Sequence, residues 1–371
     1  MKTSNFIPVS APSITQKEEE YVRKALNSGW ISSLGEFINK FERAFAEYIG
    51  TNYSLTTSNG TAALHLALTA LGIKEGDEVI IPDLTFVATA NAVTYTGAKV
   101  VTVDIEENTL CIDPKKIEAK ITEKTKAIIP VHLYGHPANM EEINKIAKKY
   151  NLYVIEDAAE AHGAEIKNKK VGTWGDCAIF SFYGNKIITT GEGGMVVTNN
   201  KELYERMKFL RNHAMSPSKK YWHTEIGFNY RMTNIQAAIG LAQLERVEDI
   251  IEKRFKIFER YCKNLSSVKG IRLNYTAPWA KNVYWMIYII VENFNYEKRD
   301  KFMEKLETYG VDTRPFFYPI SKMPMYEDND NPVAYSLASK GVCLPTFYDI
   351  KDEEIDYVCE KIIKILESFR E

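Results

Sequence analysis

The sequence lacks an apolar run long enough to cross a bilayer, because no segment approaches the roughly 20 residues that a helical span requires. Its first residues, Met1 to Ile7, also lack the apolar stretch of a signal peptide. The five cysteines are scattered and form no CxxC pair, which argues against a disulfide or zinc framework. We therefore expect reduced thiols in a cytoplasmic protein without a membrane partner.

An excess of charge of one sign is also missing. The 47 basic and 49 acidic residues give a formal net charge of −2, which provides no drive toward nucleic acid. No GxGxxG sequence follows a first strand, so a nicotinamide-dependent sugar epimerase or reductase is poorly supported. His132 and His136 pair with no cysteine or acid at zinc-ligand spacing, so no metal is expected.

The 371 residues suffice for two domains. From residue 54 onward, short apolar runs alternate with helical patterns. Strands this apolar are buried on both faces, as in a mainly parallel mixed sheet between helices. We predict an α/β fold with a large domain over residues 1–245, including the N-terminal helices, and a smaller C-terminal α/β domain over 246–371. One long helix from Asn234 to about Leu265 is expected to join them.

The hydrophobic periodicity predicts the individual elements. Thr15 and Glu18 form a capping-box pattern at the start of the first helix. The expected helices cover residues 16–28, 38–48, 61–71, 86–95, 141–150, 234–265, 296–310 and 353–369. The expected strands cover residues 54–57, 78–82, 99–104, 127–132, 153–157, 178–182, 194–198 and 283–291.

Lys186 and Asp157 are the candidate catalytic residues. Lys186 lies between the apolar strand 178–182 and the glycine-rich turn 191–194, and a lysine amine with a lowered pKa can attack an aldehyde. Asp157 ends another apolar strand, at the sheet edge where ligands bind. Their separation (186 − 157 = 29) allows both to face one crevice. A solvated surface lysine and an aspartate that caps a helix are the alternatives.

A third motif, Ser58-Asn59-Gly60-Thr61, precedes a helix, where free N–H groups bind phosphate. A lysine, an acid and a phosphate cradle are the parts that hold pyridoxal 5′-phosphate (PLP). Ser181 would add a hydroxyl to the phosphate site. Phe86 would stack on the PLP ring or pack in the core, and His162 would touch the cofactor or substrate or be a core histidine.

These motifs resemble those of the PLP-dependent nucleotide-sugar aminotransferases, a branch of the fold type I enzymes, over essentially the whole chain. The most specific stretches are residues 58–63, 156–159 and 181–194. Residues 225–232 and 313–319 narrow the resemblance to enzymes that act on a GDP-linked sugar. One subgroup of the family has a histidine in place of the lysine and carries out a dehydration. Lys186 therefore favours transamination.

The resemblance implies a role for each position. Lys186 would form the Schiff base with PLP, and Asp157 would pair with the ring nitrogen. Members of the family are homodimers with composite sites, so Asn229 would reach the cofactor of the neighbouring subunit. The residues assigned to the cofactor are Ser58, Asn59, Gly60, Thr61, Phe86, Asp157, Ala159, His162, Ser181, Lys186 and Asn229. Those assigned to the nucleotide sugar are Arg231, Phe316, Phe317 and Tyr318.

The implied reaction moves an amino group from L-glutamate, through pyridoxamine phosphate, to C4 of a nucleotide-linked 4-keto-6-deoxy sugar. GDP-4-keto-6-deoxy-D-mannose is the expected acceptor, and the product would enter surface polysaccharide (O-antigen) synthesis. A UDP- or dTDP-linked keto sugar, or a 3-keto sugar, is the alternative substrate. A regulator that kept the fold and lost turnover is disfavoured, because a pure binder has no need of Lys186 and Asp157.

Overall fold

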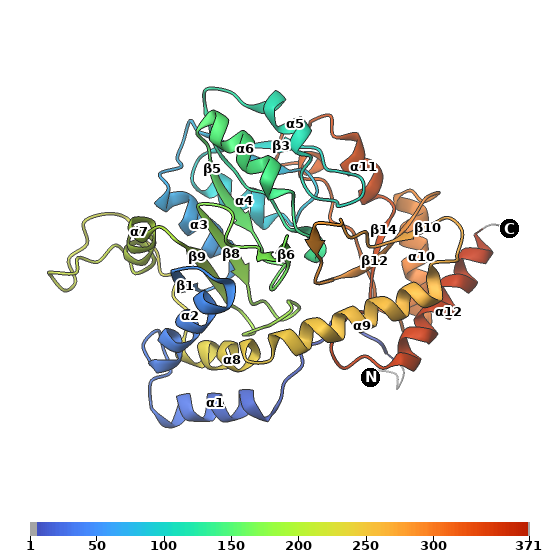
Figure 1. The fold of residues 1–371 in the computed structure, drawn as a ribbon, viewed down its shortest axis with the longest axis horizontal. Coiled ribbons are helices and arrows are strands. Elements are labelled where there is room, and N and C mark those ends of the chain that lie inside the picture. Colours follow the sequence, from blue (N-terminus) through green and yellow to red (C-terminus); the bar gives the residue numbers. More distant parts are fainter. Residues whose placement is uncertain (1–5, 370–371) are drawn as a thin grey trace.

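The computed structural model describes residues 6–369, so residues 1–5 of the segment examined for a signal peptide lie outside it. Within residues 6–369 the strands form a seven-stranded, a four-stranded and a three-stranded sheet. No helix in this range is long and apolar enough to cross a membrane. Figure 1 shows the central sheet, with the long helix α9 running from it toward the C-terminal sheet.

The central sheet has the strand order β1-β9-β8-β5-β4-β2-β3. The four pairings among β3, β2, β4, β5 and β8 are parallel, whereas β9 pairs antiparallel with both β8 and β1. The predicted mainly parallel mixed sheet is therefore confirmed. Its strands are β1 Tyr53–Thr57, β2 Glu78–Pro82, β3 Lys99–Val103, β4 Thr125–Ile128, β5 Tyr153–Asp157, β8 Cys177–Ser181 and β9 Gly194–Thr198.

Helices cover both faces of this sheet because neighbouring strand residues point to opposite sides. Phe180 packs in a core with α1, α2, α6 and α8, whereas Ile179 packs in a second core with α3, α4 and α7. The helices are α1 Gln16–Asn27, α2 Glu36–Ile49, α3 Gly60–Ala70, α4 Ala88–Tyr95, α5 Pro114–Ile117, α6 Met140–Tyr150, α7 Lys201–Arg211 and α8 Asn234–Leu244.

The C-terminal part builds its own core around an antiparallel sheet with the strand order β10-β12-β14-β13. Its elements are α9 Val247–Leu265, β10 Ile271–Leu273, β12 Ile287–Val291, α10 Tyr296–Thr308, β13 Arg314–Pro315, α11 Pro332–Ala338, β14 Gly341–Leu344 and α12 Asp352–Ser368. The third sheet joins both parts of the chain through β6 Glu165–Ile166, β7 Lys169–Lys170 and β11 Ala280–Lys281.

The expected single helix over residues 234–265 is wrong. The chain leaves helical geometry at Arg246, whose φ of −122° separates α8 from α9. This break lets the Arg246 side chain donate to the Ser13 carbonyl, a contact between distant segments that periodicity does not reveal. The division into two domains at residue 245 stays a prediction.

Two expected strands each lose four residues at one end in the structure. β4 ends at Ile128 instead of continuing to residue 132, because Pro130 has no N–H group for a ladder. β12 starts at Ile287 instead of residue 283, since Tyr284 has a positive φ of 48° that a strand does not accommodate. Periodicity did not predict the helices α5, α7 and α11 or the strands β6, β7, β10, β11, β13 and β14.

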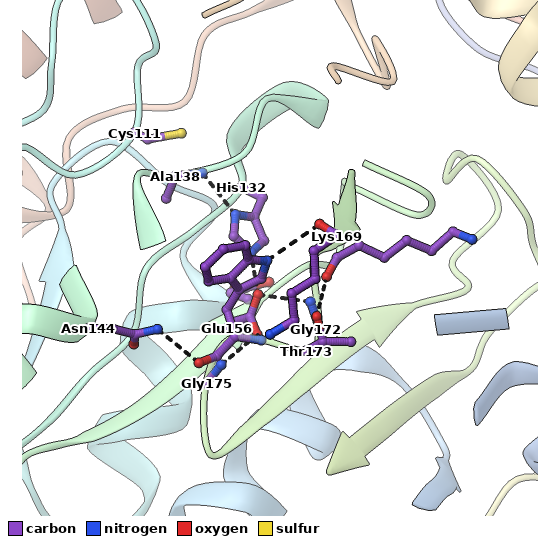
Figure 2. Close-up of polar contacts among 12 residues, drawn as sticks. Cys111, His132, Ala138, Asn144, Glu156, Lys169, Gly172, Thr173 and Gly175 are labelled. Atoms are coloured by element: carbon purple, nitrogen blue, oxygen red, sulfur yellow. Dashed lines mark hydrogen bonds and ion pairs between the residues drawn. The ribbon is translucent and has the colours of Figure 1, made fainter. Parts of the chain in front are cut away.

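A buried carboxylate fixes the end of β5 beside the candidate site. Glu156 is fully buried and accepts hydrogen bonds from the backbone N–H groups of Gly172, Trp174 and Gly175 at 2.7–2.8 Å. His132 Nε2 lies 3.1 Å from the same carboxylate, and His132 Nδ1 accepts from Ala138 N (Figure 2). Nδ1 is therefore unprotonated, and Nε2–H donates to Glu156. These bonds attach β5 to two loops.

We predict that Glu156→Gln lowers the free energy of unfolding by about 2–4 kcal/mol, because an amide nitrogen would face N–H donors and leave them unpaired. Urea denaturation followed by circular dichroism measures the change. Glu142→Gln, an exposed change on α6, is the control and should have little effect. An unchanged midpoint for Glu156→Gln would contradict this account of the network.

Candidate active site

A cavity of about 570 Å³ lies beyond the carboxyl ends of the parallel strands. Residues from α3, from the segment after β2, and from the ends of β5 and β8 line it, together with two aromatic residues from the C-terminal part. Nine of the residues predicted from the sequence line this cavity: Asn59, Gly60, Thr61, Phe86, Asp157, Ala159, Ser181, Lys186 and Phe317. The fold therefore brings the three predicted motifs to one place.

The Lys186 side chain is held between an acid and an indole ring. Its Nζ lies 3.4 Å from Glu160 Oε1 and 3.8 Å from the centre of the Trp285 ring. The Trp285 Nε1–H donates to the carbonyl of Asn185 at 2.8 Å, so the ring is fixed to the residue before the lysine. Because the side chain is only 11% exposed, this amine is no solvated surface group.

Asp157 ends β5 and is held from two sides. Its Oδ2 accepts from Thr89 Oγ1 at 2.8 Å, and its Oδ1 accepts from the N–H of Ala159 at 3.2 Å. Burial raises the pKa of Asp157, although these hydrogen bonds and the charge of Lys186 oppose the shift. A cationic N–H group placed in the cavity would favour the ionised carboxylate.

The start of α3 provides hydrogen-bond donors that can bind an anion. The Asn59 side chain caps the helix by accepting from the N–H of Ala62 at 2.8 Å. A Cβ on Gly60 would lie 3.0 Å from Ser181 Cβ and 3.3 Å from its Oγ, so a larger residue would require Ser181 to shift, and glycine lets the helix start lie close to β8. The N-terminal N–H groups and the Ser181 hydroxyl thus line the same cavity, which fits a phosphate group.

Several predicted residues lie outside this cavity. Ser58 is half-buried, and its N–H donates to the Tyr230 carbonyl. Asn229 is exposed and accepts from the half-buried Arg231, and neither residue lines the cavity. Phe316 is fully buried against Tyr134 and Tyr288, and the hydroxyl of Tyr318 accepts from Arg299.

His162 is a core residue in the structure. Its ring is fully buried against Phe180 and Phe182, with centroid distances of 5.3 and 5.6 Å. Burial lowers the pKa of His162 to about 3, so the ring is neutral at ordinary pH. Neither ring nitrogen has a hydrogen-bond partner among residues 6–369. His162 is not among the residues that line the cavity, which favours the alternative of a core histidine, and the contact with cofactor or substrate stays a prediction.

Among the cavity residues that were not predicted from the sequence, Thr89, Glu160 and Trp285 contact Asp157 or Lys186. Glu160 follows Asp157 by three residues, and this spacing after a strand end was the one available signal. Burial raises the pKa of Glu160 to about 7, against the opposing charge of Lys186 and the hydrogen bond from the N–H of Tyr134. Trp285 comes from a segment about 100 residues beyond Lys186, and no local pattern indicates its approach.

A lysine and a carboxylate that line one cavity beyond the strand ends, beside a helix start whose N–H groups fit a phosphate, match the cofactor site of a PLP enzyme of fold type I. The DegT/DnrJ/EryC1/StrS aminotransferase family matches residues 12–363. The chain belongs to this family and is a PLP-dependent sugar aminotransferase.

The comparisons with individual proteins span nearly the whole chain. It is 50% identical to GDP-perosamine synthase of Escherichia coli O157:H7 (96% of this chain, 98% of the relative). It is 46% identical to GDP-perosamine synthase of Caulobacter vibrioides (97% and 98%). Among solved structures, the PLP-form of Spr1654 from Streptococcus pneumoniae, assigned as a sugar aminotransferase, superposes with a TM-score of 0.93 at 29% identity (98% and 99%).

We predict that Glu160→Gln stabilises the apoprotein in a pH-dependent manner. In the folded state Glu160 keeps its proton up to about pH 7, whereas its ordinary pKa is 4.5. The folded chain thus binds more protons between these values, and this group's contribution to stability falls as pH rises. The variant should gain on the order of 1–3 kcal/mol at pH 8 and little at pH 5. Thermal unfolding at both pH values measures the effect. A difference in Tm between variant and wild type that is the same at pH 5 and pH 8 would contradict this prediction.

Proposed function

We propose that the protein moves an amino group from L-glutamate to C4 of GDP-4-keto-6-deoxy-D-mannose and so forms GDP-perosamine. The observation that carries the transaminase chemistry is the convergence of Lys186 and Asp157 on one cavity. The sugar and the nucleotide are proposed from the two relatives named GDP-perosamine synthase, which match at 46–50% identity over nearly their full length.

The residues divide into those that hold PLP and those that move protons. Bound PLP supplies an aldehyde and a ring that accepts an electron pair, which is the chemistry that transamination needs. Asn59, Gly60, Thr61 and Ser181 would bind its phosphate, and Asp157 would accept a hydrogen bond from the ring nitrogen. Phe86 lies at the cavity wall, where it can pack against the ring.

Lys186 would both anchor the cofactor and transfer protons. Its Nζ needs to lose a proton before it can act as a nucleophile or base. Glu160 Oε1, at 3.4 Å, is the nearest carboxylate oxygen that holds Nζ in place. Because the pKa of Glu160 is raised to about 7, this carboxyl can exchange a proton near neutral pH. The low exposure of Lys186 also keeps bulk water from the amine.

We further propose a cytoplasmic homodimer in which Asn229 and Arg231 complete the site of the neighbouring subunit. The segment between α7 and α8 extends away from the body of the chain (Figure 1). Three of its large apolar residues are exposed, Tyr221 by 77%, Trp222 by 55% and Ile226 by 90%, as expected for a surface that another subunit covers.

Initial rates on three nucleotide series test the proposed substrate. Glutamate with GDP-4-keto-6-deoxymannose should give the highest kcat/KM, with parallel double-reciprocal plots, because each substrate reacts in its own half-reaction. Faster turnover of the UDP- or dTDP-linked sugars would keep the aminotransferase and reject the GDP substrate. Intersecting plots would contradict the two-step scheme, and an absence of turnover on every series would favour a regulator.

Lys186→Ala should reduce kcat by at least about 10³–10⁴-fold, because both the anchor of the cofactor and the proton-transferring amine are lost. The control is Lys201→Ala, which removes an exposed lysine at the start of α7. Turnover near the wild-type rate in Lys186→Ala would remove this residue from its assigned role.

A further inference from the structure

Two buried carboxylates outside the cavity connect the central sheet to the C-terminal part of the chain. Asp83 follows β2 directly, and Asp104 follows β3. Their exposures are 0% and 2%, and neither lines the cavity. Buried carboxylates require hydrogen-bond donors. Residues 320–334 supply all three donors to the Asp83 carboxylate and two of the four donors to the Asp104 carboxylate.

Asp83 holds this segment through both its side chain and its backbone. Its Oδ1 accepts from the N–H of Ser321 at 2.7 Å, and its Oδ2 accepts from the Ser321 hydroxyl at 2.7 Å. The Asn331 amide donates to the same Oδ2 at 2.9 Å. The Asp83 carbonyl accepts from the N–H of Ile320 at 2.8 Å. Three side-chain bonds and one backbone bond thus fix residues 320–331 to the end of β2.

Asp104 fixes the continuation of the same segment. Its Oδ1 accepts from the N–H of Ala334 at 2.9 Å, and its Oδ2 accepts from the N–H of Val333 at 3.2 Å. Lys116 balances its charge, with Nζ 2.7 Å from Oδ2. These contacts anchor the start of α11, which Figure 1 shows beside β3 and α5.

Residues 320–334, which the two carboxylates hold, begin three residues after Phe317, a residue that lines the cavity. The Phe317 ring lines the cavity, with its centroid 5.6 Å from that of Phe86. Phe86 follows Asp83 by three residues, and Phe317 precedes Ile320, whose N–H donates to the Asp83 carbonyl, by three residues. The backbone of Phe317 also has a contact that does not involve Asp83, because its N–H donates to the Tyr134 hydroxyl at 3.2 Å. The chain just after Phe317 is therefore held by a carboxylate that does not line the cavity.

We propose that Asp83, supported by Asp104, is a positioning residue that sets the Phe317 wall and thereby the affinity for the sugar substrate. The inference rests on the proposed aminotransferase function. The groups that fit PLP belong to α3, β5 and β8 on the central sheet, whereas Phe317 comes from the C-terminal part. Movement of the Phe317 wall should therefore change binding of the keto sugar more than the reaction with glutamate.

The test uses the PLP-loaded enzyme and the variant Asp83→Asn, which keeps the side-chain shape but places an N–H₂ group among three donors. Asp330→Asn is the matched control, because it makes the same chemical change at an exposed position beside Asn331. We expect Asp83→Asn to raise the KM for the keto sugar about tenfold, the scale of one unsatisfied buried hydrogen bond. The rate of the glutamate half-reaction should stay within about twofold of wild type.

Hydrogen exchange of residues 314–325 gives a readout that needs no substrate. Exchange should be faster in Asp83→Asn than in the wild type and unchanged in Asp330→Asn. If the wild type uses another keto sugar nucleotide, the proposed substrate fails and the KM comparison is made with that sugar instead. An unchanged sugar KM with faster exchange overturns the inference, as does an equal loss in both half-reactions.

A double-mutant cycle shows whether Asp83 acts through Phe317. In the Phe317→Ala background, Asp83→Asn should change the sugar KM by less than about twofold, since no wall ring remains to be positioned. Fully additive effects would overturn the inference. If Asp83→Asn does not fold, Ser321→Ala carries the same test, because it removes one hydrogen bond to Asp83 and leaves the carboxylate in place.

Discussion

Buried carboxylates at or just after the ends of the parallel strands are the constraint on which the rest of the structure depends. A carboxylate removed from water has to find hydrogen-bond donors, so each one fixes the element that supplies them. Asp83 and Asp104 fix residues 320–334, and Glu156 fixes the loop at residues 172–175. Asp157 instead faces the cavity. The same edge of the sheet thus anchors the C-terminal part and carries the chemistry.

The acids at the site differ in their partners, and this difference assigns their roles. Asp157 is held by Thr89 and by the N–H of Ala159, and its position suits a permanent partner for a ring nitrogen. Glu160 contacts Lys186, and its raised pKa suits a group that exchanges protons. The lysine is confined by Glu160 and Trp285, which come from opposite parts of the chain. Both parts are therefore needed to place one amine.

The local parts of this arrangement could be predicted from the sequence. β2, β5 and β9 have the predicted bounds, because each is a short apolar run with clear ends. Lys186 was predicted because it follows such a run, and Asp157 was predicted because it ends one. The contacts of Lys186 with Glu160 and Trp285 were missed, since they join distant segments. Asp83, like Asp157, lies at the carboxyl end of a short apolar run, so the local sequence does not separate their roles. Asp83 is an anchor because hydrogen-bond donors from a distant segment surround its carboxylate, whereas Asp157 lines the cavity.

The central claim is that Lys186 forms the covalent bond to PLP, and a reduction experiment tests it most directly. The PLP-loaded enzyme is treated with borohydride, which makes a lysine–PLP bond permanent, and the digested peptides are analysed by mass spectrometry. The account predicts a single pyridoxyl label on Lys186, lost when glutamate is added before reduction. A label on another lysine, or no label on a protein that retains PLP, would contradict it.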